Sequence, residues 1–400
     1  MKVIVSQYGS RRRYMIPQLL HRHGCLSALY TDSTSDSLLG KFAEKLARYF
    51  GSKGSLARLA NRKTGLPKNR VKTNDLLQIK LILNRLLGRS TLDSVTTIFE
   101  GSAKQYKKWG VGDADWLYAM FIENYDFTRF AKEQGLKVIV DIYEDPYIWE
   151  ELLDEISKKE YGAIRHLKEF YEAQAILRQN YIDNILETAD KYLVPSEYVK
   201  KCLERNPKYD ASKVNIIPYA SSVNNKKYCN NAVVGRIIWV GNDAVRKGLC
   251  YCAEAASILK RRYGLLDFRI IGRLPEGLKK DPFYKDLNFI GYCNKSQLEE
   301  EFKKADMFVF PTLAEGFAAV LLEASSFGVP VITTDASGFP SSAPCIFIEK
   351  HNVDEIVEAV SSMIENRKAR DILSKITFDY SQSIGKSEFG DRLMELLRSE

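Results

Sequence analysis

Apolar, strand-like segments alternate with helix-like segments along almost the whole chain, and this alternation restricts the fold more than any other feature. Short apolar runs such as Lys2–Ser6, Leu26–Thr31 and Trp116–Met120 are followed by segments with helical spacing. The same pattern restarts at Ile237–Val240 and continues through Met307–Pro311. Strands that alternate with helices form parallel sheets with helices packed on both faces. The sequence therefore predicts an α/β fold of the doubly wound type.

The length of the chain favours two domains, because 400 residues exceed what one hydrophobic core usually supports. Residues 221–234 are polar and lack periodicity, which is typical of a linker. We therefore expect a first domain at residues 1–220 and a second at 221–381, both Rossmann-like and facing a cleft between them. The final helix, residues 382–400, is expected to pack back on the first domain.

Composition argues against several classes of protein. The chain has 45% hydrophobic and 28% charged residues, as globular proteins do, and no apolar run approaches the roughly 18–20 residues of a membrane span. The first residues read as a strand rather than a signal peptide, because polar residues follow within a few positions. Seven cysteines without framework spacing, Cys250 and Cys252 among them, favour reduced thiols and a cytoplasmic location. Four scattered histidines form no metal-binding pattern.

Positive charge is concentrated in residues 41–90, which hold 13 basic and 2 acidic side chains interleaved with apolar residues in helix-like spacing. Such a surface suits anionic lipid, as on a membrane, or a phosphate-bearing acceptor. A solvated pair of helices with a basic face explains the same pattern, and the sequence leaves both interpretations open. The region carries no recognised nucleic-acid motif, so we expect no nucleic-acid partner.

Two glutamates surround the start of a helix in the second half of the chain. Glu315 follows the strand Met307–Pro311, and Glu323 lies farther along the helix that leads to the strand Val329–Thr334. Ligands of parallel α/β sheets bind at the carboxyl ends of the strands. A helix that begins there offers free N–H groups and a positive dipole end to phosphate. Two carboxylates around such a start suit a ligand with hydroxyl groups and phosphates, which describes a nucleotide sugar.

A second candidate site, Val240–Leu249, follows the first strand of the second domain. Gly241 lets a ligand approach the backbone, and Arg246 and Lys247 place two cations at the start of the next helix. An Arg-Lys pair alone is more often solvated. Beside the glutamates at the same sheet edge, however, it supplies the cations that a diphosphate needs.

The order of these motifs resembles that of the donor domain of retaining GT-B glycosyltransferases, specifically family 4. The resemblance spans about residues 235–340, whereas the first half of the chain matches only in outline. The segments that carry it are Arg246–Gly248, Phe289–Tyr292, Ala305–Pro311, the E-x7-E element Glu315/Glu323, and Ser326–Ile332.

The resemblance implies a GT-B fold and a role for each residue of the donor site. Glu315 would hydrogen-bond the hydroxyls of the donor sugar, and Glu323 those of the ribose. Lys247, helped by Arg246, would neutralise the departing diphosphate, so that neither a metal nor another cofactor is required. The family retains the anomeric configuration through a front-face, oxocarbenium-like step. The other donor-binding residues would be Gly9, Gly241, Asn242, Arg273, Tyr292, Gly316, Phe317 and Ala318.

The chain departs from the family pattern at two places. Asn242 stands where members commonly have arginine, so one phosphate-binding cation is missing there. The strand and loop at residues 137–146 supply Asp141, Tyr143 and Glu144 where members often place a histidine facing the donor sugar. These residues bind sugar hydroxyls or the acceptor, or they form an acidic loop that caps the following helix.

Other activities fit the residues less well. Asp113 and Asp115 form the D-x-D metal motif of the GT-A architecture, but they precede a strand, where turn residues are expected. The turn Gln7–Arg12 lacks the G-x-G-x-x-G fingerprint of nicotinamide oxidoreductases. A GT-B-type sugar-nucleotide epimerase and a nucleotide-sugar-binding subunit that has lost catalysis remain as alternatives.

We therefore predict a metal-independent, retaining, hexosyltransferase-like glycosyltransferase that uses a nucleotide-diphosphate sugar. Its acceptor is expected to be a glycan or lipid-linked, in cell-surface polysaccharide or glycolipid synthesis. We expect the protein in the cytoplasm, peripheral on the inner face of the membrane.

Overall fold

The computed structural model divides into two compact units. It describes residues 1–50, 59–89, 91–158, 168–218, 227–228, 231–264, 266–384 and 387–399. The first unit comprises Met1–Tyr143, Glu172–Leu193 and Glu204–Asn215, and the second Glu144–Tyr171, Val194–Leu203 and Ile216–Glu400. The predicted boundary near residue 220 and the predicted packing of residues 382–400 on the first domain stay predictions.

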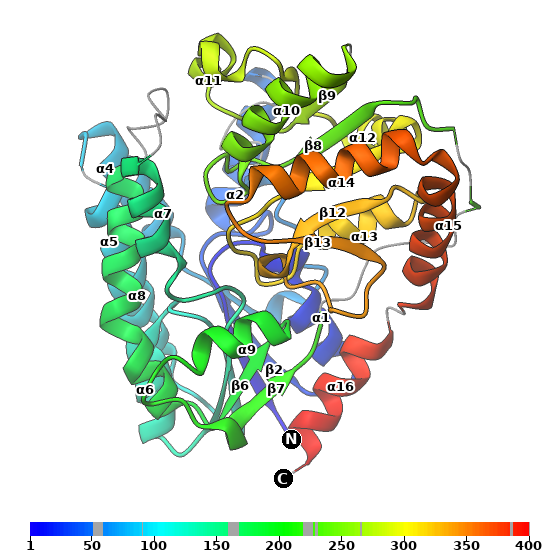
Figure 1. Cartoon of the computed structure of the whole chain (residues 1–400). Coiled ribbons are helices and arrows are strands. Elements are labelled where there is room, and N and C mark those ends of the chain that lie inside the picture. The colour runs from blue at the N-terminus through cyan, green and yellow to red at the C-terminus, as the bar shows by residue number, and fades with distance from the viewer. Residues whose placement is uncertain are drawn as a thin grey trace. The chain divides into compact units, whose positions relative to one another are not determined.

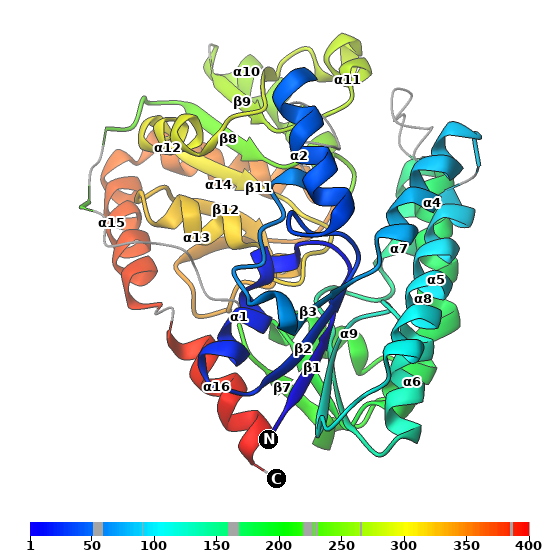
Figure 2. The same ribbon diagram turned by 180° about the vertical axis from the view of Figure 1, so that it is seen from behind.

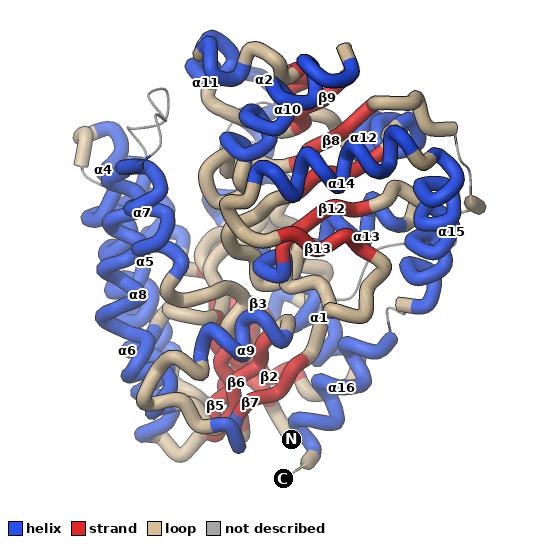
Figure 3. Tube along the Cα trace, in the orientation of Figure 1, coloured by secondary structure: helices blue, strands red, loops and turns tan. Residues whose placement is uncertain are grey.

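The first unit is built on a seven-stranded sheet with the order β3-β2-β1-β4-β5-β6-β7, shown with red strands in Figure 3. Every strand pair with a described register is parallel, for example Val3 opposite Leu26 and Trp116. The strands are β1 (Val3–Ser6), β2 (Leu26–Thr31), β3 (Val71–Thr73), β4 (Trp116–Met120), β5 (Lys137–Asp141), β6 (Lys191–Val194) and β7 (Val214–Ile216).

Helices cover both faces of this sheet, as the alternating pattern predicts. α1 lies on one side and α5, α6 and α8 on the other (Figures 1 and 2). Buried Tyr30, Tyr106 and Phe127 pack against one another, with ring centroids 5.6 Å apart. The helices are α1 (Met15–Arg22), α2 (Leu38–Phe50), α4 (Asp75–Leu86), α5 (Thr91–Trp109), α6 (Tyr125–Glu133) and α8 (Lys168–Thr188).

The second unit contains a six-stranded parallel sheet with the order β10-β9-β8-β11-β12-β13. In its central strands, Ile237–Trp239 of β8 and all of β11 are apolar and buried, as expected for a sheet covered on both faces. The strands are β8 (Arg236–Val240), β9 (Asp267–Ile271), β10 (Asn288–Gly291), β11 (Met307–Phe310), β12 (Val331–Thr334) and β13 (Cys345–Ile348).

Helices also cover both faces of the second sheet, α10 and α14 on one side and α12 and α13 on the other (Figures 1 and 2). Local sequence explains several starts: Asn294 and Gln297 form a capping box at α12, and Asn352 and Asn366 cap α14 and α15. The helices are α7 (Ile148–Lys158), α9 (Glu197–Leu203), α10 (Leu249–Tyr263), α11 (Glu276–Lys280), α12 (Lys295–Lys304), α13 (Ala319–Ser325), α14 (Val353–Glu365), α15 (Arg367–Ser383) and α16 (Ser387–Arg398).

A buried ion pair attaches α15 to the sheet of the second unit. Asp306, at the start of β11, is fully buried and lies 2.6 Å from Arg367 and 2.9 Å from Arg370. It also accepts the N–H of Gly235 at 2.8 Å. A carboxylate in the interior requires such partners, because an unpaired buried charge is strongly destabilising.

The structure differs from the predicted elements in a few places. The edge strand β3 lies inside the basic segment, where only helices were expected. The predicted break at residues 379–385 is shorter, because α15 continues to Ser383. Most of the predicted linker at residues 221–234 lies outside the described residues. Among the described residues, no helix is both long and apolar enough to cross a membrane.

Candidate functional site

Two loops of the second unit bring the three predicted catalytic residues together. β8 and β11 pair in parallel, so the loops after Val240 and Phe310 leave the same edge of the sheet. Nζ of Lys247 lies 2.5 Å from Oε1 of Glu315. Nη1 of Arg246 lies 2.8 Å from the same oxygen. The side chains of Lys247 and Glu315 are each 15% exposed, so both cations meet one carboxylate in a mostly desolvated place.

Burial and mutual charge shift the pKa values of this cluster. Burial lowers the pKa of Lys247, and the neighbouring charge of Arg246 adds to the effect, so the pKa stays below its ordinary value despite Glu315. Burial would raise the pKa of Glu315, but the charges and hydrogen bonds of Arg246 and Lys247 outweigh it and lower the pKa. The carboxylate of Glu315 is therefore ionised at neutral pH. Of the two cationic side chains, Lys247 has the lower pKa and loses its proton first.

Two glycines allow the loop after β8 to hold Lys247 in this position. A Cβ on Gly241 would lie 2.4 Å from Cδ of Lys247 and 2.8 Å from the ring of Trp239. Gly248 has a φ of +65°, and a Cβ there would lie 2.0 Å from the carbonyl oxygen of Pro311. A side chain at Gly241 would displace Lys247 or Trp239, and one at Gly248 would collide with backbone, so the Arg-Lys-Gly motif has a steric reason for its glycine.

Arg246 is positioned by Asp243 and Tyr171, neither of which was a predicted site residue. Its Nε lies 3.2 Å from Asp243, which also accepts the hydroxyl of Tyr171 at 2.8 Å. Burial lowers the pKa of Arg246, but the charges of Glu315, Asp243 and Glu144 outweigh burial and raise it. Glu144 is thus the one of the three acceptor-side candidates that belongs to this unit and acts on the cluster. Asp243 was visible in the motif, whereas nothing in the sequence linked Tyr171 to it.

The loops after β8, β9 and β10 also meet one another. Oδ1 of Asn242 accepts the N–H of Arg273 at 2.8 Å, and the guanidinium of Arg273 lies 4.0 Å from the ring centre of Tyr292. A Cβ on Gly272 would lie 1.7 Å from the carbonyl oxygen of Gly241, so this approach of the backbones requires glycine. The predicted donor-binding residues Asn242, Arg273 and Tyr292 therefore lie together, and their roles stay predictions.

The loop between β11 and α13 is longer than the sequence indicated. α13 begins at Ala319, so Glu315 lies in the loop, and Glu323 lies half-buried in the helix. Of the N–H groups at 316–318, that of Ala318 donates to the carbonyl of Ser337 at 2.9 Å and is already engaged. The predicted phosphate contacts of Gly316 and Phe317 stay predictions.

In the first unit, the predicted residue Gly9 lies in a turn fixed by a buried carboxylate. Gly9 has a φ of +72° and donates its N–H to Asp32 at 2.9 Å. Asp32 is fully buried and also accepts from Arg62 at 2.5 Å and Gln78 at 2.6 Å. A Cβ on Gly9 would meet no atom within 4 Å, so the turn leaves room beside its backbone. The role of Gly9 toward phosphates stays a prediction.

The other two acceptor-side candidates are paired with arginines of the first unit. Asp141 is fully buried, 2.9 Å from Arg12, and accepts the hydroxyl of Tyr118 at 2.6 Å. Tyr143 accepts a hydrogen bond from Arg11 at 2.8 Å, and the guanidinium lies 4.3 Å from its ring centre. Asp141 therefore serves the packing of its own unit, and its predicted contact with a ligand stays untested.

The segment that supplies these arginines has an unusual backbone. Arg12, Arg13 and Tyr14 have φ values of 47°, 51° and 61°, in the left-handed region that such residues rarely adopt. Glu123, 2.5 Å from Arg11 and 2.7 Å from the N–H of Tyr8, helps to hold this conformation. Arginine and tyrosine have no preference for this region, so the local sequence gave no signal of it.

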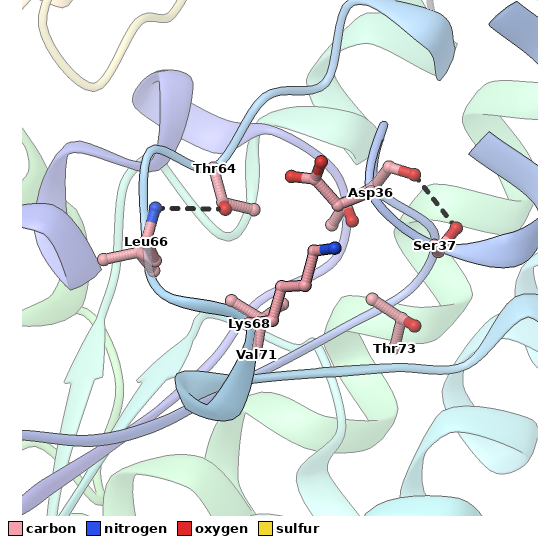
Figure 4. Close-up of a pocket in the computed structure, with 8 residues that line it drawn as sticks. Asp36, Ser37, Thr64, Leu66, Lys68, Val71 and Thr73 are labelled. Atoms are coloured by element: carbon pink, nitrogen blue, oxygen red, sulfur yellow. Dashed lines mark hydrogen bonds between the residues drawn. The ribbon is translucent and has the colours of Figure 1, made fainter. Parts of the chain in front are cut away.

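A cavity of about 130 Å³ opens where β2 and β3 end (Figure 4). The amine of Lys68 and the carboxylate of Asp36 face it from two segments (Figure 4). Its remaining lining consists mainly of hydroxyl side chains, a set suited to hydrogen bonds with a polyhydroxylated ligand. The residues that line it are Thr34, Asp36, Ser37, Thr64, Leu66, Lys68, Val71 and Thr73.

The residues of the two metal motifs that the sequence argued against lie in other surroundings. Asp115, of the D-x-D triplet, lies just before β4 and accepts the backbone N–H of Lys2 at 2.6 Å. Cys250 and Cys252 are buried in α10. Within the described ranges, no three His, Cys, Asp or Glu side chains form a group that could hold a metal ion.

The second half of the chain matches a protein family, and the whole chain aligns with solved structures. Residues 235–366 match the family described as Glycosyl transferases group 1. The solved structure of Anabaena Alr3699/HepE in complex with UDP and glucose aligns with 100% of both chains, with a TM-score of 0.60 at 11% identity. The chain has the GT-B fold. The group 1 segment of this GT-B chain contains Arg246, Lys247, Glu315 and Glu323.

Two curated relatives match parts of the same GT-B chain. The amylovoran biosynthesis glycosyltransferase AmsK of Erwinia amylovora is 28% identical over 130 residues, which are 30% of each protein. An N,N'-diacetylbacillosaminyl-diphospho-undecaprenol alpha-1,3-N-acetylgalactosaminyltransferase of Campylobacter jejuni is 25% identical over 153 residues. That match covers 36% of this chain and 37% of the relative, so the chain spans about a third of each curated protein.

Proposed function

We propose that this chain is a retaining glycosyltransferase of family 4 that takes its sugar from a nucleoside diphosphate sugar. The observation that carries the proposal is the contact of Glu315 with Lys247 and Arg246 where β8 and β11 end. The match of residues 235–366 to glycosyl transferases group 1 supports it, as does the UDP and glucose in a structure of the same fold. The names of the relatives describe transferases, so neither an epimerase nor a subunit without catalysis is favoured.

The cluster supplies both kinds of group that such a donor requires. Without a donor, Glu315 balances the charges of Lys247 and Arg246. A bound diphosphate takes over contacts with the two cations, and oxygens of Glu315 become available to the sugar hydroxyls. The departing diphosphate carries more negative charge in the transition state than in the ground state, so fixed cations accelerate its release. These cations take the part of a metal ion, and the anomeric configuration is retained without a protein nucleophile.

The remaining donor residues bind the nucleotide. Asn242, Arg273 and Tyr292 form the side of the site that faces the base. Glu323 binds the ribose hydroxyls, and Gly9 contacts the phosphates. The two backbone N–H groups at 316–317 complete the contacts with the phosphates.

The acceptor is a glycan or a lipid-linked saccharide that the first unit binds. The cavity with Lys68 and Asp36 offers hydrogen bonds to such a ligand, and we assign Asp141, Tyr143 and Glu144 to contacts with the acceptor as well. The relative from Campylobacter jejuni is named for a diphospho-undecaprenol substrate, and that from Erwinia amylovora for amylovoran biosynthesis. The protein therefore works in cell-surface polysaccharide or glycolipid synthesis, in the cytoplasm and peripheral on the membrane.

A thermal-shift panel of UDP-, GDP- and ADP-sugars tests the proposed donor. One of them, at about a hundred times its dissociation constant, is expected to stabilise the protein by about 2.7 kcal/mol. The variant Lys247→Met is expected to lose most of this shift, because it removes a phosphate contact and keeps the length of the side chain. If no nucleotide sugar raises the melting temperature, the proposal is wrong.

Donor binding is expected to weaken at alkaline pH. The pKa of Lys247 lies below its ordinary value, so the amine loses its proton, and its attraction to phosphate, earlier than a free lysine does. Calorimetric titration of the donor across a pH series is expected to give a falling limb centred below about pH 10.4, the ordinary pKa of lysine. In Lys247→Arg this limb is expected to disappear, since arginine stays charged. An unchanged limb in this variant would assign it to another group.

A further inference from the structure

One face of α4 packs within the first unit. Leu77 and Leu81 are buried, as is Asn84. A Cβ on Gly101 of α5 would lie 3.1 Å from Cδ1 of Leu77, and Nδ2 of Asn84 donates to Thr97 of the same helix at 3.2 Å. These residues, spaced by four and three, fix which side of α4 faces α5. The two helices run next to each other in both views (Figures 1 and 2).

The opposite face of α4 is apolar and exposed. Leu76 is 75% exposed, Leu83 50% and Leu86 77%. Six of the 18 large hydrophobic side chains that are exposed in the described ranges fall within the twelve residues 76–87, so they form a patch and are not scattered. The residues of this outer face are Leu76, Ile79, Ile82, Leu83, Leu86 and Leu87.

A surface helix normally carries charged or polar residues on its outer side. The outer face of α4 instead exposes six apolar side chains, which indicates that a partner covers it. Gly88, with a φ of +64°, turns the chain directly after this helix, so Leu86 and Leu87 stand at the tip of a helical hairpin.

Charge decides between the partners that an apolar face accepts. Lys80 and Arg89 are exposed beside the outer face, and residues 41–90 hold 13 basic against 2 acidic side chains. A second copy docked by two-fold symmetry would bring the same positive charges together, which is unfavourable. An anionic surface with an apolar interior satisfies both the charges and the leucines.

We propose that the outer face of α4 inserts into the interface of an anionic lipid membrane, with Leu86 and Leu87 deepest and Lys80 and Arg89 at the headgroups. A helix of twelve residues is about 18 Å long, short of the roughly 30 Å hydrocarbon core, so it lies in the interface and does not span it. The inference goes beyond the basic charge of the region, because it assigns the contact to one helix face. It does not depend on the proposed sugar transfer.

Co-sedimentation of the full chain with lipid vesicles tests the proposal. The protein is expected to bind vesicles that contain about 30% phosphatidylglycerol and to bind pure phosphatidylcholine weakly. The outer-face variant Ile79→Gln/Leu83→Gln/Leu86→Gln is expected to lose at least about tenfold in partition coefficient, which is about 1.4 kcal/mol. The charge variant Lys80→Gln/Arg89→Gln is expected to bind less well, and wild type to lose affinity in high salt.

A matched control changes exposed apolar residues elsewhere. Ile372 and Ile376 on α15 are 53% and 49% exposed, and the variant Ile372→Gln/Ile376→Gln is expected to bind vesicles like wild type. All the replaced side chains are exposed, and glutamine suits helices, so the variants are expected to fold. Circular dichroism and the nucleotide-sugar thermal shift of the outer-face variant check this.

The proposal is overturned if the outer-face variant binds vesicles as well as wild type. It is also overturned if wild type does not bind the anionic vesicles. A dimer in sedimentation velocity that this variant dissociates would then show that α4 pairs with a second copy. A vesicle result of either kind leaves the donor proposal standing, because vesicle binding needs no nucleotide sugar. Conversely, an unsuccessful sugar panel leaves the membrane proposal standing.

Discussion

Replacing Glu315 by glutamine is expected to lower the rate of sugar transfer about a thousandfold while nucleoside diphosphate binding persists or tightens. Glutamine keeps the shape of the side chain but removes the charge that balances Lys247 and Arg246. The charges of Lys247 and Arg246 are then no longer neutralised by Glu315 and attract the diphosphate more strongly. The sugar loses an anionic hydrogen-bond acceptor. The variant therefore separates kcat from affinity for the nucleotide.

Single-turnover rates and calorimetric affinity for the nucleoside diphosphate, measured on the same preparation, check this prediction. The free energy of unfolding is also expected to fall, by about 3 kcal/mol, because a buried ion pair loses one partner. Lys247→Met serves as the opposite control, since it is expected to lose affinity together with rate. A Glu315→Gln enzyme with normal turnover would remove Glu315 from the proposed chemistry.

Replacing Gly248 by alanine is expected to destabilise the protein by about 3 kcal/mol and to disturb the cation pair beside it. A Cβ at this position would lie 2.0 Å from the carbonyl oxygen of Pro311, which is backbone and cannot rotate away. The positive φ of +65° adds a further cost for any side chain. Either Pro311 or the Arg246–Lys247 segment must move, and both belong to the site.

Gly24→Ala is the matched control for this variant. Gly24 follows the end of helix α1 with a similar φ of +69°, but a Cβ there would meet no atom within 4 Å. We expect it to cost about 1 kcal/mol, from backbone conformation alone. Urea unfolding measures the free energy that each variant loses. The difference between the two losses is the cost of the steric clash with Pro311. Equal losses would show that the close approach to Pro311 is not limiting.

The sequence predicted the doubly wound α/β sheets because strand and helix periodicity is a local property, whereas the GT-B fold was implied by the family resemblance. The strands that frame the site, β8 and β11, were found within one or two residues of their bounds. The edge strand β3 was missed, because three half-exposed residues carry no clear pattern. The roles of the individual site residues stay predictions, although Glu315, Lys247 and Arg246 do meet.

Contacts between distant segments were beyond the reach of the sequence. The partnership of Tyr171 with Asp243 joins residues 72 positions apart, and that of Arg12 with Asp141 joins residues 129 positions apart. The left-handed backbone at Arg12–Tyr14 follows no local preference and is held by such distant carboxylates. Likewise, the helical spacing of apolar residues in α4 did not indicate that the leucines on its outer face are exposed.

By itself, the sequence determined which elements form and which motifs follow adjoining strands, because hydrophobic periodicity and turn residues act over a few positions. The tertiary structure alone decided which charges neutralise one another and which apolar faces are covered. The reason is physical: burial and Coulomb interaction depend on distance in space. Glu315 could be found from the sequence, but the pairing that keeps it ionised could be found only from the fold.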